Sequence, residues 1–265
     1  AILERERVSE NKIVYLNRKD EIGTLSKEIQ KMSSGLKLQI QQLEKFSADV
    51  SHELKNPLTS LQSAMELIDK ETISKEDKQM LYKNMLNDII RMNKLITDIS
   101  KFTRLKAEIE LEKNQLIDLN VFLNELPIMF TNNKKEIELI INKCDEKVEL
   151  LGNKNKLIQV FVNLIENSIS LSPKKSKILI ELDKIDENSI SFRFYDQGKG
   201  ISSQDSEKVF DRFYSDRQEN IKNHTGLGLS IAREIITHMN GKIYLDKSYK
   251  VDYSGACFLI ILPVR

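Results

Sequence analysis

The sequence of 265 residues is 31% charged and 40% hydrophobic, which fits a folded globular protein of one or two domains and excludes a disordered or fibrous chain. Lys and Arg number 41 against 40 Asp and Glu, so the formal net charge of +1 provides no global field that favours nucleic acid or an anionic membrane. No run of about 18 apolar residues predicts a transmembrane helix, and the start does not resemble a signal peptide. Because the chain opens at Ala1 within charged helical text, we expect a piece of a longer protein.

The N-terminal part of the chain is predicted to be helical. Residues 1–35 form a first short helical piece that contains "DEIGTLSKEIQKM". From Gly35 to Ile68 apolar residues recur at steps of three and four, and after a polar break at 74–77 the same steps continue to Phe102, which indicates two helices of a bundle. A short turn between them predicts an antiparallel hairpin, and because neither apolar stripe can bury both sides of it, we predict a homodimer with a four-helix bundle.

The stretch "FSADVSHELKNPLTSL" (46–61) places a histidine on the first of these helices. His52 falls off the apolar seam, on the face that we expect to meet solvent, with Glu53 beside it and Asn56 one helical turn later. An imidazole is a competent nucleophile near neutral pH when an adjacent base takes its proton. Pro57 removes one helical hydrogen bond and predicts a kink next to the histidine.

The sequence lacks the ligand spacing of a zinc site. The metalloprotease pattern His-Glu-x-x-His needs a second histidine where this chain has Asn56, so the ligand count fails around His52. Cys144 and Cys257 are far apart in sequence and have no partner spacing for a metal, so we expect buried or free thiols and a reducing compartment.

From about Leu116 the pattern changes to a mixture of strands and helices. Strands are predicted at 177–185, 189–196, 241–247 and 255–264, and helices at 157–171 and 227–239. This mixture predicts an α/β sandwich in which helices are layered on one sheet. The charged residues 106–116 are the expected linker to the helical part.

Three polar or glycine-rich signals follow one another in this second domain. In "NLIEN", Asn163 and Asn167 lie on one helical face as oxygen ligands suited to Mg²⁺, although a plain polar helix face gives the same pattern. "DQGKGI" places Asp196, Gly198 and Gly200 directly after a strand, which fits a ligand-binding loop or a simple turn. In "HTGLGLSIAREII", two glycines precede a helix whose free N–H groups favour a phosphate, and these glycines are Gly226 and Gly228.

Between the glycine pairs lies the long charged segment "EKVFDRFYSDRQENIKNH" (207–224). Its length predicts a lid that closes over a ligand, while Phe210 and Phe213 could equally be core anchors.

Taken together, these stretches resemble the sensor histidine kinases of two-component signalling over nearly the whole chain. "FSADVSHELKNPLTSL" resembles the H box, "NLIENS" the N box, "DQGKGI" and "TGLGLSIAREI" the two glycine boxes, and "FDRFYSD" the F box, in the family's order. "DEIGTLSKEIQKM" resembles the second helix of a HAMP signal-relay module. Within the family, "ADVSHELKNPLTSL" with "FYSDR" most resembles alphaproteobacterial envelope-sensing kinases.

The resemblance implies a fold class of α+β, with three domains. Residues 1–35 would be a partial HAMP helix, 36–108 a dimeric helical hairpin for dimerisation and histidine phosphotransfer, and 116–265 a Bergerat-type ATP-binding α/β sandwich. His52 would be phosphorylated, Glu53 would be the acid/base beside it, and Asn56 would align water in dephosphorylation of the partner. In the second domain, the nucleotide residues by resemblance would be Asn163 and Asn167 for Mg²⁺ and phosphates, Asp196 for the adenine amino group, and Gly198, Gly200, Gly226 and Gly228 for the pocket and lid.

This sequence departs from the family where a Lys-Tyr or Arg-Tyr pair often follows the N box. Ser170 and Leu171 occupy those places, so Lys174 or Arg212 is a candidate substitute for the missing basic contact. Two other functions stay open. An ATPase of the gyrase, chaperone or mismatch-repair kind would use Glu166 to activate water, and a non-catalytic coiled-coil scaffold would carry a degenerate nucleotide domain.

The resemblance also implies the partners and the location of the protein. ATP and Mg²⁺ are the expected cofactors, and a response regulator is the expected acceptor of the phosphoryl group. We expect a membrane anchor and sensor region upstream of Ala1, so that this chain would be the cytoplasmic portion of a bacterial inner-membrane protein. No nucleic-acid partner is expected.

Overall fold

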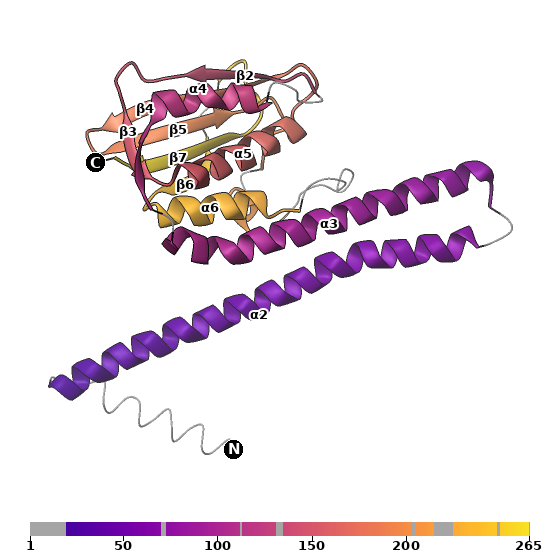
Figure 1. The fold of residues 1–265 in the computed structure, drawn as a ribbon, viewed down its shortest axis with the longest axis horizontal. Coiled ribbons are helices and arrows are strands. Elements are labelled where there is room, and N and C mark those ends of the chain that lie inside the picture. The colour runs from indigo at the N-terminus through magenta and orange to yellow at the C-terminus, as the bar shows by residue number, and fades with distance from the viewer. Residues whose placement is uncertain are drawn as a thin grey trace. The chain divides into compact units, whose positions relative to one another are not determined.

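The computed structural model describes residues 20–69, 73–111, 113–130, 135–202, 205–214, 225–247 and 250–264, without the side chains of 106–111. The chain divides into two compact units, residues 1–55 and residues 56–265. Helix α2 crosses this division as one continuous element (Figure 1).

Helix α2 spans Glu21–Ile68, so residues 21–35 of the predicted separate helical piece belong to one long helix, while residues 1–19 of that prediction lie outside the described residues. Gly35 lies within it and costs about 1 kcal/mol relative to Ala. The hydroxyl of Ser34, which could compete with the helix, donates to the Gln30 carbonyl at 2.8 Å and stays within the turn. A weak breaker is therefore overridden by the helix formers on both sides of it.

Helix α3 spans Lys75–Leu111 and begins where the polar break was predicted. Ser74 caps it, because the Asp77 N–H donates to the Ser74 hydroxyl oxygen at 3.1 Å and that hydroxyl donates to the Asp77 carboxylate at 2.7 Å. The helix continues through most of the segment 106–116 that we predicted as a linker. Charged Lys and Glu residues are good helix formers, and charge alone did not end the helix.

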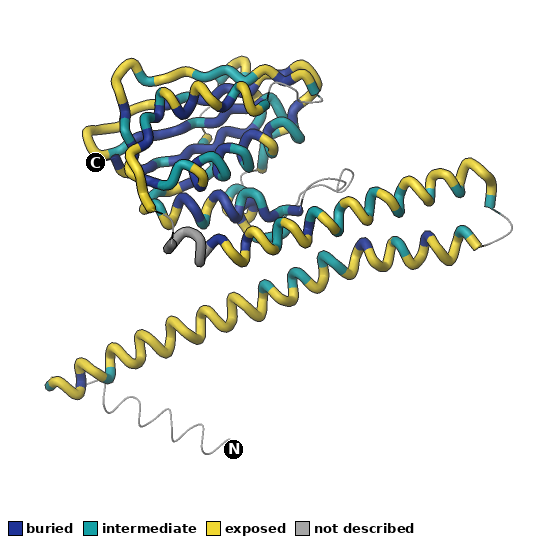
Figure 2. Tube along the Cα trace, viewed as in Figure 1, coloured by how far each residue is buried: buried dark blue, intermediate teal, exposed yellow. Residues whose placement is uncertain are grey.

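Many seam residues of the two long helices are exposed in the single chain, as Figure 2 shows by the length of exposed helix. Leu43 is 66% exposed and Met80 is 64% exposed, and a continuous stripe of such apolar side chains, unlike a single one, is normally covered in the assembled protein. The other large apolar residues that are at least half exposed on these helices are Ile22, Leu25, Ile29, Met32, Leu36, Leu38, Ile40, Met65, Tyr82, Leu86, Ile90 and Ile96.

The second part of the chain is built on a five-stranded sheet in the order β2-β4-β5-β7-β6. The strands are β2 (Glu138–Asn142), β4 (Lys177–Asp186), β5 (Ser189–Tyr195), β6 (Lys242–Asp246) and β7 (Cys257–Pro263). The pair β2 and β4 is parallel, whereas the other neighbours are antiparallel. Strands β1 (Gln115–Asp118) and β3 (Glu149–Gly152) form a separate antiparallel pair.

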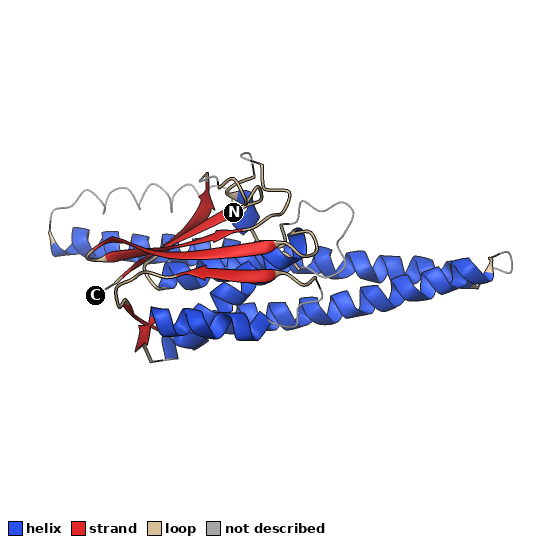
Figure 3. Cartoon of the chain, turned by 90° about the horizontal axis from the view of Figure 1, so that it is seen from above, coloured by secondary structure: helices blue, strands red, loops and turns tan. Residues whose placement is uncertain are grey.

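Helices α4 (Leu119–Phe130), α5 (Lys154–Leu171) and α6 (Gly228–His238) cover one face of this sheet (Figures 1 and 3). The core between the layers centres on Phe161 of α5, whose ring packs edge-on against Phe122, Phe192 and Phe194 at centroid distances of 5.0, 5.0 and 4.9 Å. Burying each such ring stabilises the fold by about 1.5–3 kcal/mol. The predicted fold class, two long helices followed by an α/β sandwich, is confirmed.

The strands and helices predicted after residue 150 agree with the structure to within a few residues. Four short elements, α4, β1, β2 and β3, were not predicted from the sequence, and α4 contains Pro127. The short 3-10 helix η1 (Lys208–Phe210) lies in the segment predicted as a lid.

Candidate functional site

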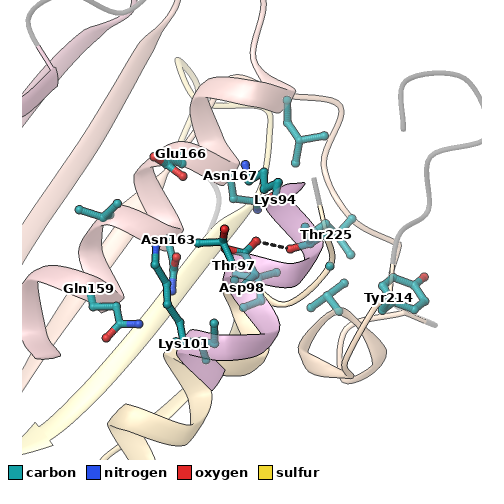
Figure 4. Close-up of a pocket in the computed structure, with 18 of the residues that line it drawn as sticks. Lys94, Thr97, Asp98, Lys101, Gln159, Asn163, Glu166, Asn167, Tyr214 and Thr225 are labelled. Carbon is teal, nitrogen blue, oxygen red and sulfur yellow. Dashed lines mark hydrogen bonds between the residues drawn. The ribbon is translucent and has the colours of Figure 1, made fainter. Parts of the chain in front are cut away.

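A cavity of about 530 Å³ opens within residues 56–265, between α3, α5, the two glycine-rich turns and the start of α6. This size is in the range of pockets that hold nucleotides and similar ligands. Figure 4 shows labelled lining residues from α3 and α5 around one space. Of the predicted site residues, Asn163, Asn167, Gly200, Gly226 and Gly228 line this cavity.

Helix α5 presents a polar face to the cavity. The Asn153 side chain caps the helix by accepting a hydrogen bond from the Lys156 N–H at 3.1 Å, and the extended Ser172 ends it just before Pro173. While the opposite face is buried in the core, Gln159, Asn163, Glu166 and Asn167 line the cavity. Side chains three and four residues apart share a helix face, so the cap and the apolar pattern together fix these four side chains.

The Asn163 amide has a polar atom without a protein partner. Its Nδ2 atom is buried and makes no hydrogen bond in the structure. A buried amide group left unpaired is costly, and such a group in a pocket is explained by a ligand that pairs with it. Asn163 is therefore suited to contact a polar ligand in the cavity.

Asp196 ends β5 and is almost completely buried, with 1% exposure. Its Oδ1 atom accepts hydrogen bonds from the Gly198 N–H at 2.9 Å and the Ala256 N–H at 3.0 Å, and its Oδ2 atom accepts one from the Ser168 hydroxyl at 3.2 Å. Burial raises the pKa of Asp196, and these three donors counteract the rise. Asp196 is not among the residues that line the cavity.

Gly255 is a structural requirement of the Asp196 site that the sequence analysis missed. A Cβ atom at this position would lie 1.9 Å from the Asp196 Oδ1 atom and 2.5 Å from the Gly198 nitrogen. The Gly255 N–H donates to the Asp196 carbonyl oxygen at 3.0 Å. The distant loop at Gly255 thus closes over the carboxylate, and no residue larger than glycine fits there.

The second glycine turn is held by contacts on both of its sides. Gly226 has a φ of +71°, and a Cβ atom on it would lie 2.6 Å from the Phe213 backbone. The Phe213 N–H donates to the Gly226 carbonyl oxygen at 3.0 Å. Gly228 begins α6, where no side chain caps the first turn, so the N-terminal N–H groups of this helix are available to an anion.

The predicted lid (207–224) lies mostly outside the described residues, which in this segment are 207–214. Phe210 is buried and packs edge-on against Phe258 at 6.1 Å, so it is a core anchor. Tyr214 lines the cavity. Whether residues 215–224 close over a ligand stays a prediction.

Helix α3 lines the cavity with five side chains that the sequence analysis did not assign to it. These are Asn93, Lys94, Thr97, Asp98 and Lys101. The Thr225 hydroxyl, next to Gly226, donates to the Asp98 Oδ2 atom at 2.6 Å, and Figure 4 marks this bond. Helical periodicity alone could not predict that these residues line the cavity, because the solvent-exposed face of a helix has the same polar pattern.

The basic residues suggested as substitutes for the missing family contact do not line the cavity. Lys174 lies elsewhere, and the Arg212 guanidinium stacks over the Phe102 ring at 4.7 Å. Ser170 donates its hydroxyl to the Asn167 carbonyl at 2.9 Å, while Leu171 contributes to the cavity wall. The lysines that line the cavity are Lys94, Lys101 and Lys199.

The histidine motif lies on α2. His52 and Asn56 are exposed and Glu53 is partly buried, and all three are within the uninterrupted helix, which continues through Pro57. The predicted exposure of His52 is thus present in the structure. A histidine in this setting can meet a reactive group that is brought to it by another part of the protein.

No group of three or more His, Cys, Asp or Glu side chains among the described residues could hold a metal ion by itself. The amide and carboxylate oxygens of Asn163, Asn167 and Glu166 are nevertheless hard donors of the kind that Mg²⁺ accepts. Mg²⁺ usually keeps waters and shares phosphate oxygens of a bound nucleotide. The donor set fits a metal that enters with its nucleotide.

Comparison with protein families matches two domain models to this chain. The His Kinase A (phospho-acceptor) domain matches residues 42–108, and the histidine kinase-, DNA gyrase B- and HSP90-like ATPase domain matches residues 152–265. This chain belongs to the sensor histidine kinases. The first match contains the His52 motif and the second contains the cavity residues of α5, α6 and the glycine turns, so the family resemblance is confirmed and the second domain is an ATP-binding domain.

Relatives of this kinase chain include the sensor protein ChvG of Agrobacterium fabrum, 35% identical over 93% of this chain and 43% of the relative. ChvG of Rhizobium meliloti is 34% identical over 98% of this chain and 46% of the relative. The chain thus spans less than half the length of these two proteins.

Solved structures of histidine kinases share the fold of this kinase chain. Histidine kinase ThkA in complex with the response regulator protein TrrA has a TM-score of 0.66 at 22% identity, covering 93% of this chain and 68% of the other. The Acinetobacter baumannii histidine kinase AdeS has a TM-score of 0.57 at 22% identity, covering 81% and 98%. At this level of identity the likeness concerns the fold.

Within the described residues, α2 and α3 are long but neither is apolar enough to cross a bilayer.

Proposed function

We propose that this chain is a protein histidine kinase that transfers the terminal phosphoryl group of ATP to His52 and then to an aspartate of a response regulator. The observation that carries the proposal is the pairing of two sites in one chain. An exposed histidine followed by a glutamate lies within a phospho-acceptor domain, and an ATP-binding domain contains a cavity with an unpaired amide.

The chemical step would need little from the protein beyond positioning and charge neutralisation. An imidazole nitrogen of His52 would form a bond to the terminal phosphorus while the bond from phosphorus to the ADP oxygen breaks. Glu53, the next residue on α2, would accept the imidazole proton. Glu53 is partly buried beside the exposed His52, so the proposed base is adjacent to the nucleophile along the helix.

Asp196 would select the base of the nucleotide. Its Oδ1 atom accepts hydrogen bonds from two backbone N–H groups, whereas its Oδ2 atom accepts the longer hydrogen bond from the Ser168 hydroxyl. A carboxylate oxygen with remaining lone pairs is suited to accept a hydrogen bond from the adenine amino group, directly or through one water. Gly198 and Gly200 would keep the adjoining loop close to the base.

Asn163 and Asn167 would hold Mg²⁺ together with the phosphates. The metal would neutralise the charge that develops on the transferred phosphoryl group. Asn163 sits against the glycine turn, because a Cβ atom on Gly228 would lie 3.6 Å from its amide oxygen. The free N–H groups at the start of α6 lie on the same side and favour phosphate oxygens.

We further propose a homodimer in which the exposed seam of α2 and α3 is covered by a second copy. The exposed leucines, isoleucines and methionines on these helices support this, since a four-helix bundle buries such stripes. The response regulator is proposed as a partner because the structurally similar ThkA was solved with one. Asn56, exposed one turn after His52, is proposed to align water when the kinase dephosphorylates its regulator.

The name of the ChvG relatives, sensor proteins, supports the proposal that these domains act downstream of a sensing region. The inner-membrane location stays a prediction.

Labelling with γ-labelled ATP tests the kinase. We expect acid-labile, alkali-stable label on the wild-type chain and none on His52→Gln, while both bind Mg·ADP equally. Free phosphate with unlabelled protein would instead support an ATPase that uses Glu166, which also lines the cavity. Absence of any nucleotide binding would support the alternative of a non-catalytic coiled-coil scaffold.

Asn56→Ala separates the proposed dephosphorylation of the response regulator from the phosphorylation of His52. We expect His52 labelling at the wild-type rate and slower dephosphorylation of a phosphorylated response regulator. Equal rates of dephosphorylation for the variant and the wild type would contradict the role of Asn56.

A further inference from the structure

The positive charge that faces the nucleotide cavity comes partly from a helix outside the ATP-binding fold. On α5, Ser170 and Leu171 bring no cation to the cavity, and the lining lysines are Lys94 and Lys101 of α3 and Lys199 of the first glycine loop. A bound nucleotide brings several negative charges, and lysine is a common point-charge partner of phosphate. Of the three lysines that line the cavity within the described part of the chain, two therefore come from α3.

The lining residues of α3 form one continuous face. Lys94, Thr97, Asp98 and Lys101 follow each other at helical steps of three, one and three, which places them on the same side of the helix. In Figure 4 the side chain of Lys101 extends from α3 in the direction of Asn163 on α5. The ammonium group thus points to the part of the cavity where the polar face of α5 lies.

This face of α3 is fixed to the second glycine turn. The Thr225 hydroxyl donates to Asp98 at 2.6 Å, and Thr225 itself is buried with 7% exposure. One turn further along α3, the Phe102 ring packs under the Arg212 guanidinium at 4.7 Å, and Leu105 is fully buried. A hydrogen bond and two buried apolar side chains hold α3 in one register against the cavity.

We propose that α3 completes the phosphate end of the nucleotide site, with Lys101 as a direct cationic contact to the phosphates and Asp98 as the positioning residue that holds α3 in place. The inference rests on the proposed function, because it assigns further residues to the same ATP site. It makes nucleotide affinity dependent on the position of α3. A movement of this helix would change the charge at the phosphates without altering the sandwich.

Three acidic side chains also line the cavity, and they explain why α3 lysines matter. Among the described residues, Glu166, Asp205 and Asp98 oppose the three lysines, so these lining side chains carry no excess of positive charge. The Ser202 hydroxyl donates to the Asp205 carboxylate at 2.6 Å and helps to lower the pKa of Asp205, which keeps this acid charged. Loss of one lysine from this balanced set leaves a net negative cavity for an anionic ligand.

Binding of ligands with different numbers of phosphates tests this proposal on the full chain of 265 residues. The ligands are adenosine, Mg·ADP and a non-hydrolysable Mg·ATP analogue, measured by calorimetry or by competition with a fluorescent nucleotide. For Lys101→Ala we expect unchanged adenosine affinity and roughly fivefold weaker binding of the triphosphate, with a smaller salt dependence. For Thr225→Val, which removes the hydrogen bond to Asp98 and leaves the charge of the cavity unchanged, we expect the same pattern, since α3 loses its anchor.

Lys83→Ala is the matched control, because Lys83 is an exposed lysine of α3 that does not line the cavity. Lys101→Arg should restore most of the affinity, and circular dichroism should show that every variant keeps its helix content. Triphosphate affinity of Lys101→Ala equal to that of Lys83→Ala would overturn the proposal. Tighter binding would also overturn it, since α3 would then obstruct the pocket. Wild-type triphosphate affinity in Thr225→Val would refute the role of the Thr225–Asp98 hydrogen bond as the anchor of α3.

A failure of the proposed function gives a different result. If the wild-type chain binds none of these nucleotides, the ATP site itself is refuted. If the wild type binds these nucleotides and Lys101→Ala binds them with the same affinity, the kinase assignment stands and the proposed role of α3 is refuted.

Discussion

The two candidate sites of this protein are built in opposite ways. His52 and Asn56 are exposed on a long helix, and their immediate surroundings are successive turns of that helix. Asp196 is 1% exposed and bound by two backbone N–H groups and a serine, with Gly255 packed against its carboxylate. One site displays its reactive group to solvent, and the other embeds its recognition group in the core.

This difference predicts which substitutions separate activity from stability. An exposed helix residue away from caps and buried partners changes stability by less than about 0.5 kcal/mol. A residue whose atoms satisfy buried donors cannot be changed without affecting the fold around it. Variants of the histidine motif should therefore lose phosphorylation activity without a change in stability. Variants of the Asp196 site should change both the free energy of unfolding and the nucleotide affinity.

The largest effect is expected for Asn167→Ala. This change removes an amide oxygen from the cavity face of α5 at the position proposed for Mg²⁺ and phosphates, so nucleotide binding and His52 labelling should both be abolished. The helix should tolerate alanine well. Calorimetry with Mg·ADP and autophosphorylation assays measure the loss, and sedimentation should show an unchanged oligomeric state.

A matched control for this variant is Asn155→Ala, because Asn155 is exposed in the first turn of the same helix and does not line the cavity. It should bind and label like the wild type. Normal labelling of Asn167→Ala would refute the assignment of this asparagine.

The next effect concerns Asp196→Asn. The amide oxygen can still accept from the Gly198 and Ala256 N–H groups, but an amide nitrogen replaces the Oδ2 acceptor proposed for the adenine amino group. We expect at least about tenfold weaker adenosine binding, in line with loss of a hydrogen bond to a charged group. Binding measurements with adenosine and Mg·ADP check this.

The stability of Asp196→Asn should change with pH in a defined direction. Burial raises the pKa of Asp196 above its ordinary value of 3.8, so the unfolded chain loses this proton at a lower pH than the folded chain. The contribution of Asp196 to stability falls as pH rises from 3.8 through the raised pKa. The melting temperature of the variant relative to wild type should rise between pH 4 and pH 7, and a constant difference would contradict a raised pKa.

A third test compares two glycines. For Gly255→Ala we expect a loss of about 2–3 kcal/mol in the free energy of unfolding, because the added Cβ would lie 1.9 Å from Asp196 Oδ1. For Gly35→Ala on α2, where nothing lies within 4 Å of the added Cβ, we expect a gain of about 0.5–1 kcal/mol. Urea unfolding measures both, and a stable Gly255→Ala variant would contradict the close packing at Asp196.

The smallest effect concerns the two free thiols. Burial raises the pKa of Cys257 to about 12, whereas Cys144 is only half-buried. At pH 8 a thiol reagent should modify one cysteine rapidly in the native protein and two after denaturation. Cys144→Ser should remove the rapid phase, and a rapid phase that persists in this variant would contradict burial of Cys257.

The sequence predicted the later elements well, because their local signals agreed with the final packing. The strand at 177–185 is β4 and the helix at 157–171 lies within α5, where apolar periodicity, a cap and a following proline all point the same way. The prediction of a separate helical piece that ends near Gly35 was wrong, and α3 extends into the predicted linker 106–116 as far as Leu111. A single glycine or a run of charges carries a weak penalty that neighbouring helix formers override.

The sequence by itself determined the order and chemical type of the motifs, since each is a local pattern of a few residues: an exposed histidine beside an acid, an amide pair on one helix face, and glycines at turns. Only the tertiary structure decided which distant residues share a site. Thr225 meets Asp98 across 127 positions, and Gly255 closes over Asp196. Such contacts form only when elements that are distant in sequence pack together, so a local sequence pattern of a few residues cannot predict them.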